Sequence, residues 1–129
     1  MKQRSAYLLI STTLFASVVL VACSAGYPTT GGSTDLPPQV QEARMLIRDK
    51  YPEASYYRIK MNFTRDDETV NAWTNDSDWI YLSSKWIVKA NNDIVHAACI
   101  IVHEWYHRQG YNEVDAENEE TKCKQLIRG

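Results

Sequence analysis

The chain has 129 residues and a formal net charge of −2 at pH 7. This length predicts one domain. A mildly acidic chain argues against nucleic acid as a partner, because such partners are bound by basic surfaces.

The first 22 residues have the layout of a secretory signal peptide. A basic start at Met1–Arg4 precedes an apolar run from Ala6 to Ala22 that ends in small residues. The run is too short and too weakly flanked to predict a permanent membrane span. We therefore expect residues 1–22 to be removed.

The end of this segment, Leu-Val-Ala-Cys at Leu20–Cys23, resembles a bacterial lipobox. In such lipoproteins the chain is cut before the cysteine, which is then lipidated. The resemblance implies that Cys23 anchors the protein to the membrane of the bacterial cell envelope. Ser24 implies sorting to the outer membrane, facing the periplasm, if the host is Gram-negative. The alternative is an ordinary signal peptide with an unrelated cysteine.

Residues 24–38 are rich in Gly, Pro, Ser and Thr and have almost nothing to bury. This composition predicts a flexible tether over residues 23–38. The folded domain is then expected over residues 39–129.

The first half of this domain predicts one helix followed by strands. Apolar residues at helical spacing favour a helix over 39–50, which Pro52 would end. Alternation of apolar and polar residues over 55–63 is typical of a half-buried strand. Two further strands are expected at 69–74 and 79–82, with polar turns between them. We expect an α+β fold with a small antiparallel sheet of about three strands.

Helices fill the rest of the chain. A short one is expected from Ser83 or Ser84 to Val88. The next, over 94–109, follows the stretch Asn91–Asp93, which offers an N-cap, and is apolar nearly all round, which is typical of a core helix. Gly110 is well placed to end it. A last helix over 113–127, capped by Asn112, carries acids first and basic residues last, as the helix dipole favours.

Two histidines lie four residues apart in the stretch HEWYH, at His103 and His107. Four residues advance a helix by about 6 Å and keep both side chains on one stripe, so both imidazoles can reach one metal ion. Glu104 points to the side of the pair, where it can hold a water molecule next to the metal. The alternative is a polar patch that neighbouring groups satisfy through hydrogen bonds.

A catalytic zinc takes three protein ligands and keeps one position open, so a third ligand is expected after His107. The acids available are Glu113, Asp115, Glu117 and Glu120. Gly110 lets the chain reverse, and Glu113 is the closest acid that a tight reversal delivers. Glu117, one turn later, is the alternative, either as a ligand or as an acceptor for a histidine N–H.

These residues resemble a zincin metallopeptidase of the gluzincin type. In several such families the third ligand is the first Glu of an E-x-x-A-[DEN] segment, which Glu113 and Ala116 match. The spacing is unusually short, and HExxHxxGxxE is also similar to the metzincin pattern. The resemblance covers about residues 79–120. It implies a minimal zincin-like domain with Zn²⁺ held by His103, His107 and Glu113.

The resemblance also implies hydrolysis of peptide bonds, with Glu104 as the general base. Tyr111 or Tyr106 is a candidate to hydrogen-bond the developing oxyanion. Zincins place a strand edge beside the active helix, and residues 69–74 or 79–82 are candidates for this edge. His96, two turns before His103, is expected to have a structural role.

Cys99 and Cys123 remain once Cys23 is assigned to the lipid. An even number of cysteines in an oxidising compartment suggests a pair. If the last two helices run antiparallel around Gly110, these cysteines lie at comparable heights, so we expect a disulfide. The alternative makes Cys99, one turn before His103, a further metal ligand that would close the site.

Three functions are open at this level. The first is a zinc-dependent peptidase tethered to the bacterial envelope, acting as a monomer on a peptide or protein substrate. The second is a non-catalytic zincin-like lipoprotein that serves as a binding module, and the third is a structural lipoprotein without metal. Glu104 favours the enzyme, because a purely structural zinc site does not need it.

Overall fold

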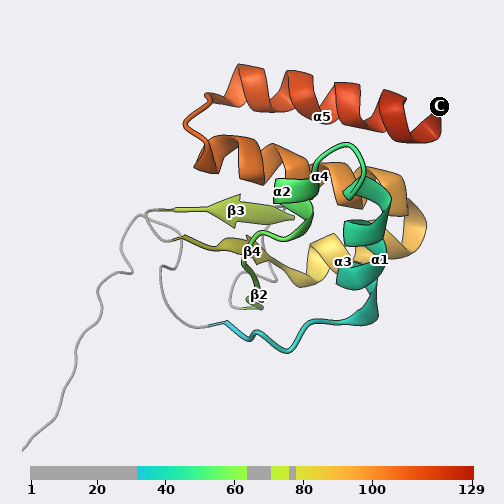
Figure 1. The fold of residues 1–129 in the computed structure, drawn as a ribbon. Helices are drawn as coiled ribbons and strands as arrows, with labels where there is room; N and C mark the ends of the chain where they lie inside the picture. Colours follow the sequence, from blue (N-terminus) through green and yellow to red (C-terminus); the bar gives the residue numbers. More distant parts are fainter. Residues whose placement is uncertain (1–31, 64–70, 76–77) are drawn as a thin grey trace, which may run out of the picture.

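The computed structural model describes residues 32–63, 71–75 and 78–129. The predicted α+β fold is confirmed: five helices and a three-stranded sheet form the described part of the chain (Figure 1). The predicted signal peptide, Cys23 and most of the predicted tether lie outside the described residues. The helices are α1 Pro38–Ile47, α2 Pro52–Ser55, α3 Ser84–Asn92, α4 Ile94–Arg108 and α5 Glu113–Arg128, and the strands are β2 Ile59–Met61, β3 Ala72–Thr74 and β4 Ile80–Leu82.

The sheet is mixed rather than antiparallel. Its strand order is β2-β4-β3, and β3 pairs with β4 antiparallel, as predicted. β2 pairs with β4 in parallel, so the prediction of an antiparallel sheet is wrong for this pair. The physical reason is that β2 and β3 flank β4 on opposite sides. The connection between β2 and β3 is longer than a hairpin turn, so it does not force them to be neighbours.

The chain contacts this sheet before α1 begins. The Ser33 N–H donates to the Met61 carbonyl at 2.7 Å, and the Met61 N–H donates to the Ser33 carbonyl at 2.8 Å. Gly32 has φ +79°, and a Cβ there would stand 2.8 Å from the Met61 oxygen. Only glycine fits this position without strain.

Two local predictions missed the extent of helices. Pro52 was expected only to end the first helix, but it opens α2, because proline is well tolerated in the first turn of a helix. The short helix expected up to Val88 is α3, which extends to Asn92. No helix among the described residues is long and apolar enough to cross a lipid bilayer.

Helix α4 is the centre of the core. Its residues from Ala97 to Glu104 are all buried. α5 packs along one side of α4, and α1, α3 and β3 contact it elsewhere (Figure 1). The buried Trp86 indole N–H donates to the Ala97 carbonyl at 2.9 Å, so α3 is joined to α4 by a satisfied polar contact.

The reversal between α4 and α5 confirms the predicted roles of Gly110 and Asn112. The Gly110 N–H donates to the His107 carbonyl, and the Tyr111 N–H donates to the Tyr106 carbonyl. These two bonds, with φ +99° at Gly110, form a Schellman motif. The Asn112 side chain then accepts from the Asp115 N–H at 2.9 Å and starts α5.

The predicted disulfide is present. Cys99 of α4 and Cys123 of α5 are bonded, with their Cα atoms 5.7 Å apart. Both side chains are fully buried. In this arrangement Cys99 is not a metal ligand, because its sulfur is bonded to Cys123.

The tight reversal predicts a specific cost for Gly110→Ala. A Cβ at this position would meet no atom within 4 Å, so the cost comes only from the left-handed backbone. We expect the free energy of unfolding to fall by about 1–2 kcal/mol in urea denaturation. Gly129→Ala is the matched control: it has φ +79° and open surroundings, but it follows α5 and is not part of the α4–α5 reversal. An equal loss in both variants would contradict the interpretation.

Candidate metal centre

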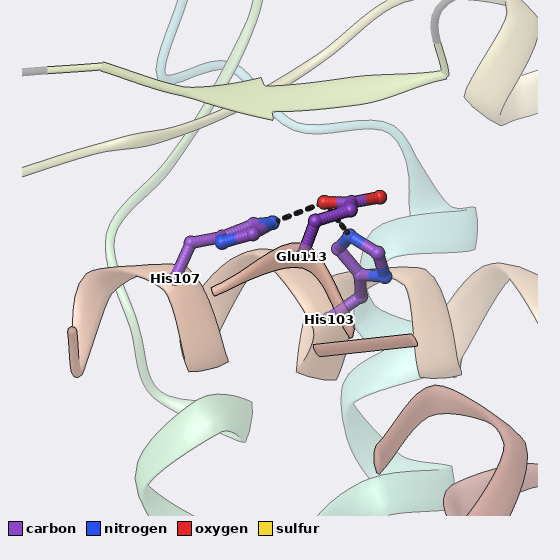
Figure 2. A group of neighbouring side chains, drawn as sticks. All are labelled: His103, His107 and Glu113. Atoms are coloured by element: carbon purple, nitrogen blue, oxygen red, sulfur yellow. Dashed lines mark hydrogen bonds and ion pairs between the residues drawn. The ribbon is translucent and has the colours of Figure 1, made fainter. Parts of the chain in front are cut away.

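Three side chains from α4 and α5 converge on one point (Figure 2). His103 and His107 lie one turn apart on α4, and Glu113 is the first residue of α5. Oε1 of Glu113 is 2.7 Å from His107 Nε2 and 3.2 Å from His103 Nε2. One ligand atom from each of the three residues lies within 4.8 Å of the others, so this group could hold a metal ion.

The far nitrogen of each imidazole has a partner that can only accept a hydrogen bond. His103 Nδ1 is 2.9 Å from Glu120 Oε1, and His107 Nδ1 is 3.1 Å from the Tyr111 carbonyl oxygen. Both Nδ1 atoms must therefore carry a proton and donate. A neutral imidazole protonated at Nδ1 has its lone pair at Nε2, which is the form that binds a metal.

The converging atoms can share either a proton or a metal ion. Two Nε2 lone pairs and a carboxylate oxygen would repel one another at these distances if nothing positive were shared. Without metal a proton fills this role. Burial alone would lower the pKa of His103, but the hydrogen bond to Glu120 and the charges of Glu104 and Glu113 outweigh it and raise that pKa to about 9. The negative charges of Glu104 and Glu113 would also favour a metal ion at this point.

Glu104 stands beside this group without a hydrogen bond from any described residue. Its side chain is 11 % exposed and lies beside His103, with Glu104 Oε2 3.9 Å from His103 Nε2. Burial, reinforced by the charges of Glu113 and Glu120, raises the pKa of Glu104 to about 8. A buried carboxylate without a donor is costly, so its position requires an explanation beyond packing.

The candidate ligands open onto a cleft between β3 and the facing ends of α4 and α5. This cleft has a volume of about 430 Å³ and is lined by β3, by the three candidate ligands and by Glu104. The Glu113 side chain is 61 % exposed, so the group is accessible from solvent. β3 supplies the wall, whereas β4 lies in the middle of the sheet. The suggestion that residues 79–82 form the edge beside the site is therefore wrong, because both sides of β4 are paired.

The other candidate acids lie elsewhere. Asp115 and Glu117 are exposed on α5 and are not part of the converging group. Glu120 contacts the far side of the His103 ring instead of the point where the ligands meet. The acceptor role proposed for Glu117 thus belongs to Glu120, which lies seven residues, or about two turns, after Glu113 and so on nearly the same face.

Tyr106 and Tyr111, the two candidates for a hydrogen bond to the oxyanion, are not among the residues that line the cleft. The Tyr106 hydroxyl interacts with Glu119, whose carboxylate also accepts from the Tyr51 hydroxyl at 2.5 Å. The Tyr111 ring stacks on Tyr106, with centroids 4.1 Å apart. Tyr111 serves the site through its backbone carbonyl, a role that no residue-type pattern could indicate.

Comparisons with models of protein families, with curated proteins and with solved structures found no match to this chain.

The geometry predicts one divalent metal ion per chain. In titration calorimetry with Zn²⁺ after treatment with a chelator, we expect a single site. Zn²⁺ at a hundred times its dissociation constant should raise the free energy of unfolding by about 2.7 kcal/mol, and chelation should reverse this gain.

The ligand set predicts that Glu113→Ala lowers the Zn²⁺ affinity at least about a hundredfold, because it removes the only anionic ligand. Glu117→Ala is the control, since it removes the same charge one turn away. If Glu117→Ala causes the larger loss, the assignment of the third ligand is wrong.

Proposed function

We propose that this protein is a zinc-dependent metallopeptidase of the gluzincin type. The observation that carries the proposal is the buried carboxyl group of Glu104, which receives no hydrogen bond from the described residues and lies beside His103, at the wall of an open cleft. A structural zinc site is closed by four protein ligands and needs no such group. A hydrolytic site needs three ligands, an open position and a base next to it.

The donor set supports zinc among the divalent metals. Two imidazoles and one carboxylate are the ligands of many hydrolytic zinc centres. The residues fit the ion without rearrangement of their outer contacts, because Glu120 and the Tyr111 carbonyl already hold both rings with Nε2 toward Glu113. When bound, zinc would supply the Lewis acidity that makes water a nucleophile at neutral pH.

The residues of the chain supply the proton transfers. The Glu104 carboxylate accepts a proton from the attacking water and then donates it to the nitrogen of the leaving amine. Its burial suits this role, because a raised pKa brings a carboxyl group closer to the working pH. Glu113 and the two histidines stay in place through both transfers.

An extended peptide is the substrate class that the cleft fits. β3 runs along one wall, and an extended chain in the cleft would lie between this strand and α4. Peptides bound beside a strand gain main-chain hydrogen bonds that do not depend on sequence. The binding-module alternative predicts the same zinc and peptide binding without cleavage.

We further propose that the protein is a lipoprotein of the bacterial cell envelope, anchored through Cys23. The support is the Leu20–Cys23 stretch after an apolar run, followed by a Gly-, Pro-, Ser- and Thr-rich segment up to the domain. A tethered domain would carry its cleft to substrates near the membrane.

The catalytic proposal is tested by Glu104→Gln, which keeps the shape and removes the base. We expect Zn²⁺ affinity to stay within about threefold, and peptide cleavage to fall by roughly 10²–10⁴, as measured on a peptide library by mass spectrometry. Glu117→Gln is the control and should cleave as the wild type does. Cleavage by the wild type that Glu104→Gln retains, or no cleavage by a zinc-loaded wild type, would contradict the proposal.

The anchoring proposal is tested by Cys23→Ser in a bacterial host. We expect the wild type in the membrane fraction, with a mass increase from acyl chains on the mature N-terminus. Cys23→Ser should lose the acyl mass and leave the membrane fraction. A wild type without acyl mass would contradict this assignment.

A further inference from the structure

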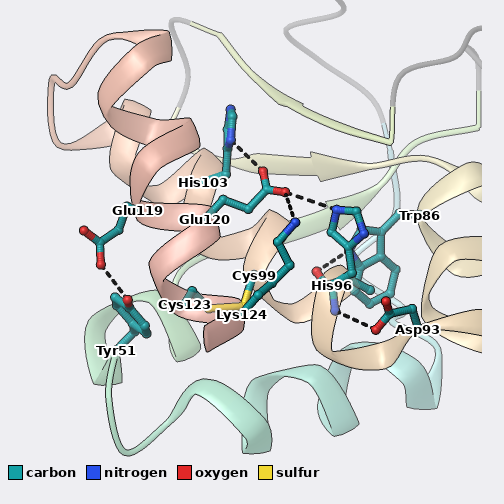
Figure 3. The surroundings of a disulfide bond; sticks show 11 residues. Tyr51, Trp86, Asp93, His96, Cys99, His103, Glu119, Glu120, Cys123 and Lys124 are labelled. Carbon is teal, nitrogen blue, oxygen red and sulfur yellow. Dashed lines mark hydrogen bonds and ion pairs between the residues drawn. A yellow bond between two sulfur atoms is a disulfide. The ribbon is translucent and has the colours of Figure 1, made fainter. Parts of the chain in front are cut away.

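Glu120 is the centre of a cluster that links the candidate metal site to the far end of α4 (Figure 3). Its two carboxylate oxygens have different partners. Oε1 is 2.9 Å from His103 Nδ1. Oε2 is 3.1 Å from His96 Nε2 and 3.4 Å from Lys124 Nζ.

The cluster is built from the facing stripes of two antiparallel helices. His96, Cys99 and His103 share one side of α4, because they are spaced by three and four residues. Glu120 and Lys124 lie one turn apart on α5, and Cys123 is between them. The Cys99–Cys123 disulfide therefore joins the helices at the level of the cluster (Figure 3).

Both carboxylate oxygens of the largely buried Glu120 side chain contact neighbouring side chains. Its side chain is 17 % exposed. The ammonium group of Lys124 can only donate, so Oε2 accepts from it. His96 Nε2 lies within hydrogen-bond distance of the same oxygen.

These contacts fix the orientation of the Glu120 carboxylate and, through it, of the His103 ring. A carboxylate held only by His103 could rotate about its last bonds and release the imidazole. Two donors on Oε2 fix the carboxylate plane, so Oε1 faces His103 Nδ1, and His103 Nε2 then faces Glu113. Partners that orient a ligand in this way set metal affinity without touching the metal.

We propose that His96 and Lys124 are positioning residues for the metal centre, acting on the ligand His103 through Glu120. The proposal rests on the metal site proposed above. It extends the site two turns along α4, and it assigns a role to His96 that the HExxH pattern does not contain.

The test measures Zn²⁺ affinity by competition with a chromogenic chelator, in oxidised protein with the disulfide intact. His96→Leu and Lys124→Met each remove a donor and keep apolar bulk. We expect each to lower the affinity by roughly tenfold, and Glu120→Ala by about ten- to a hundredfold. His96→Gln should restore most of the affinity, because its amide can donate to Glu120.

Lys122→Met is the matched control. Lys122 is exposed on α5, two residues before Lys124, and its loss removes the same charge from the helix. We expect its Zn²⁺ affinity to equal that of the wild type. The absorption spectrum of the Co²⁺-loaded protein adds a second readout, which should change in the His96→Leu and Lys124→Met variants and stay unchanged in Lys122→Met.

A double-mutant cycle separates positioning from general packing. If His96 acts through Glu120, its effect on the affinity should vanish once Glu120 is removed. We therefore expect His96→Leu to change the Zn²⁺ affinity by no more than about twofold in a Glu120→Ala background, which is the precision of such a cycle. The same holds for Lys124→Met. His96 and Lys124 are partly exposed and come from different helices. If one variant fails to fold, the double-mutant cycle with the other residue still tests the proposal.

The outcomes distinguish this inference from the function. Wild-type affinity in both single variants, or a full tenfold loss that persists in the Glu120→Ala background, overturns the positioning role. A wild type that binds no Zn²⁺ overturns both proposals. A wild type that binds Zn²⁺ and cleaves no peptide overturns the peptidase alone, while the affinity cycle still decides the role of His96 and Lys124.

Discussion

The antiparallel contact between α4 and α5 is the constraint on which the site depends. One helix carries both histidines and Glu104, and the other carries Glu113 and Glu120. The Schellman turn at Gly110 joins their near ends, and the Cys99–Cys123 disulfide joins them further along. Any change in the angle or register of the two helices would separate Glu113 from His107 and Glu120 from His103 at the same time.

This arrangement couples metal affinity to folding. The ligands come from two helices whose packing forms only in the folded state, so an ion that binds there stabilises that state. The described domain is small, and the carboxylates of Glu104, Glu113 and Glu120 lie around the His103 side chain. A divalent cation would offset the mutual repulsion of these carboxylates. The disulfide holds the helices together but does not reduce this repulsion.

Local patterns predicted the parts of the site that local geometry decides. His103 and His107 share a stripe because of helical spacing, and Glu113 follows from a short turn that Gly110 allows. The parallel pairing of β2 with β4 and the place of Glu120 depend on tertiary packing, which spacing along the chain does not encode. The Tyr111 carbonyl had no sequence signature at all, because every residue has one.

The placement of Glu104 is the strongest physical argument against a purely structural role for the HEWYH helix. Burial raises the pKa of Glu104 to about 8, so the ionised form that a general base requires is disfavoured at this position. No described residue donates a hydrogen bond to the Glu104 carboxylate. The Glu120 carboxylate, by contrast, has polar side chains as partners. A carboxyl group buried in this way, beside three converging candidate ligands and an open cleft, supports the proposed role of Glu104 in proton transfer.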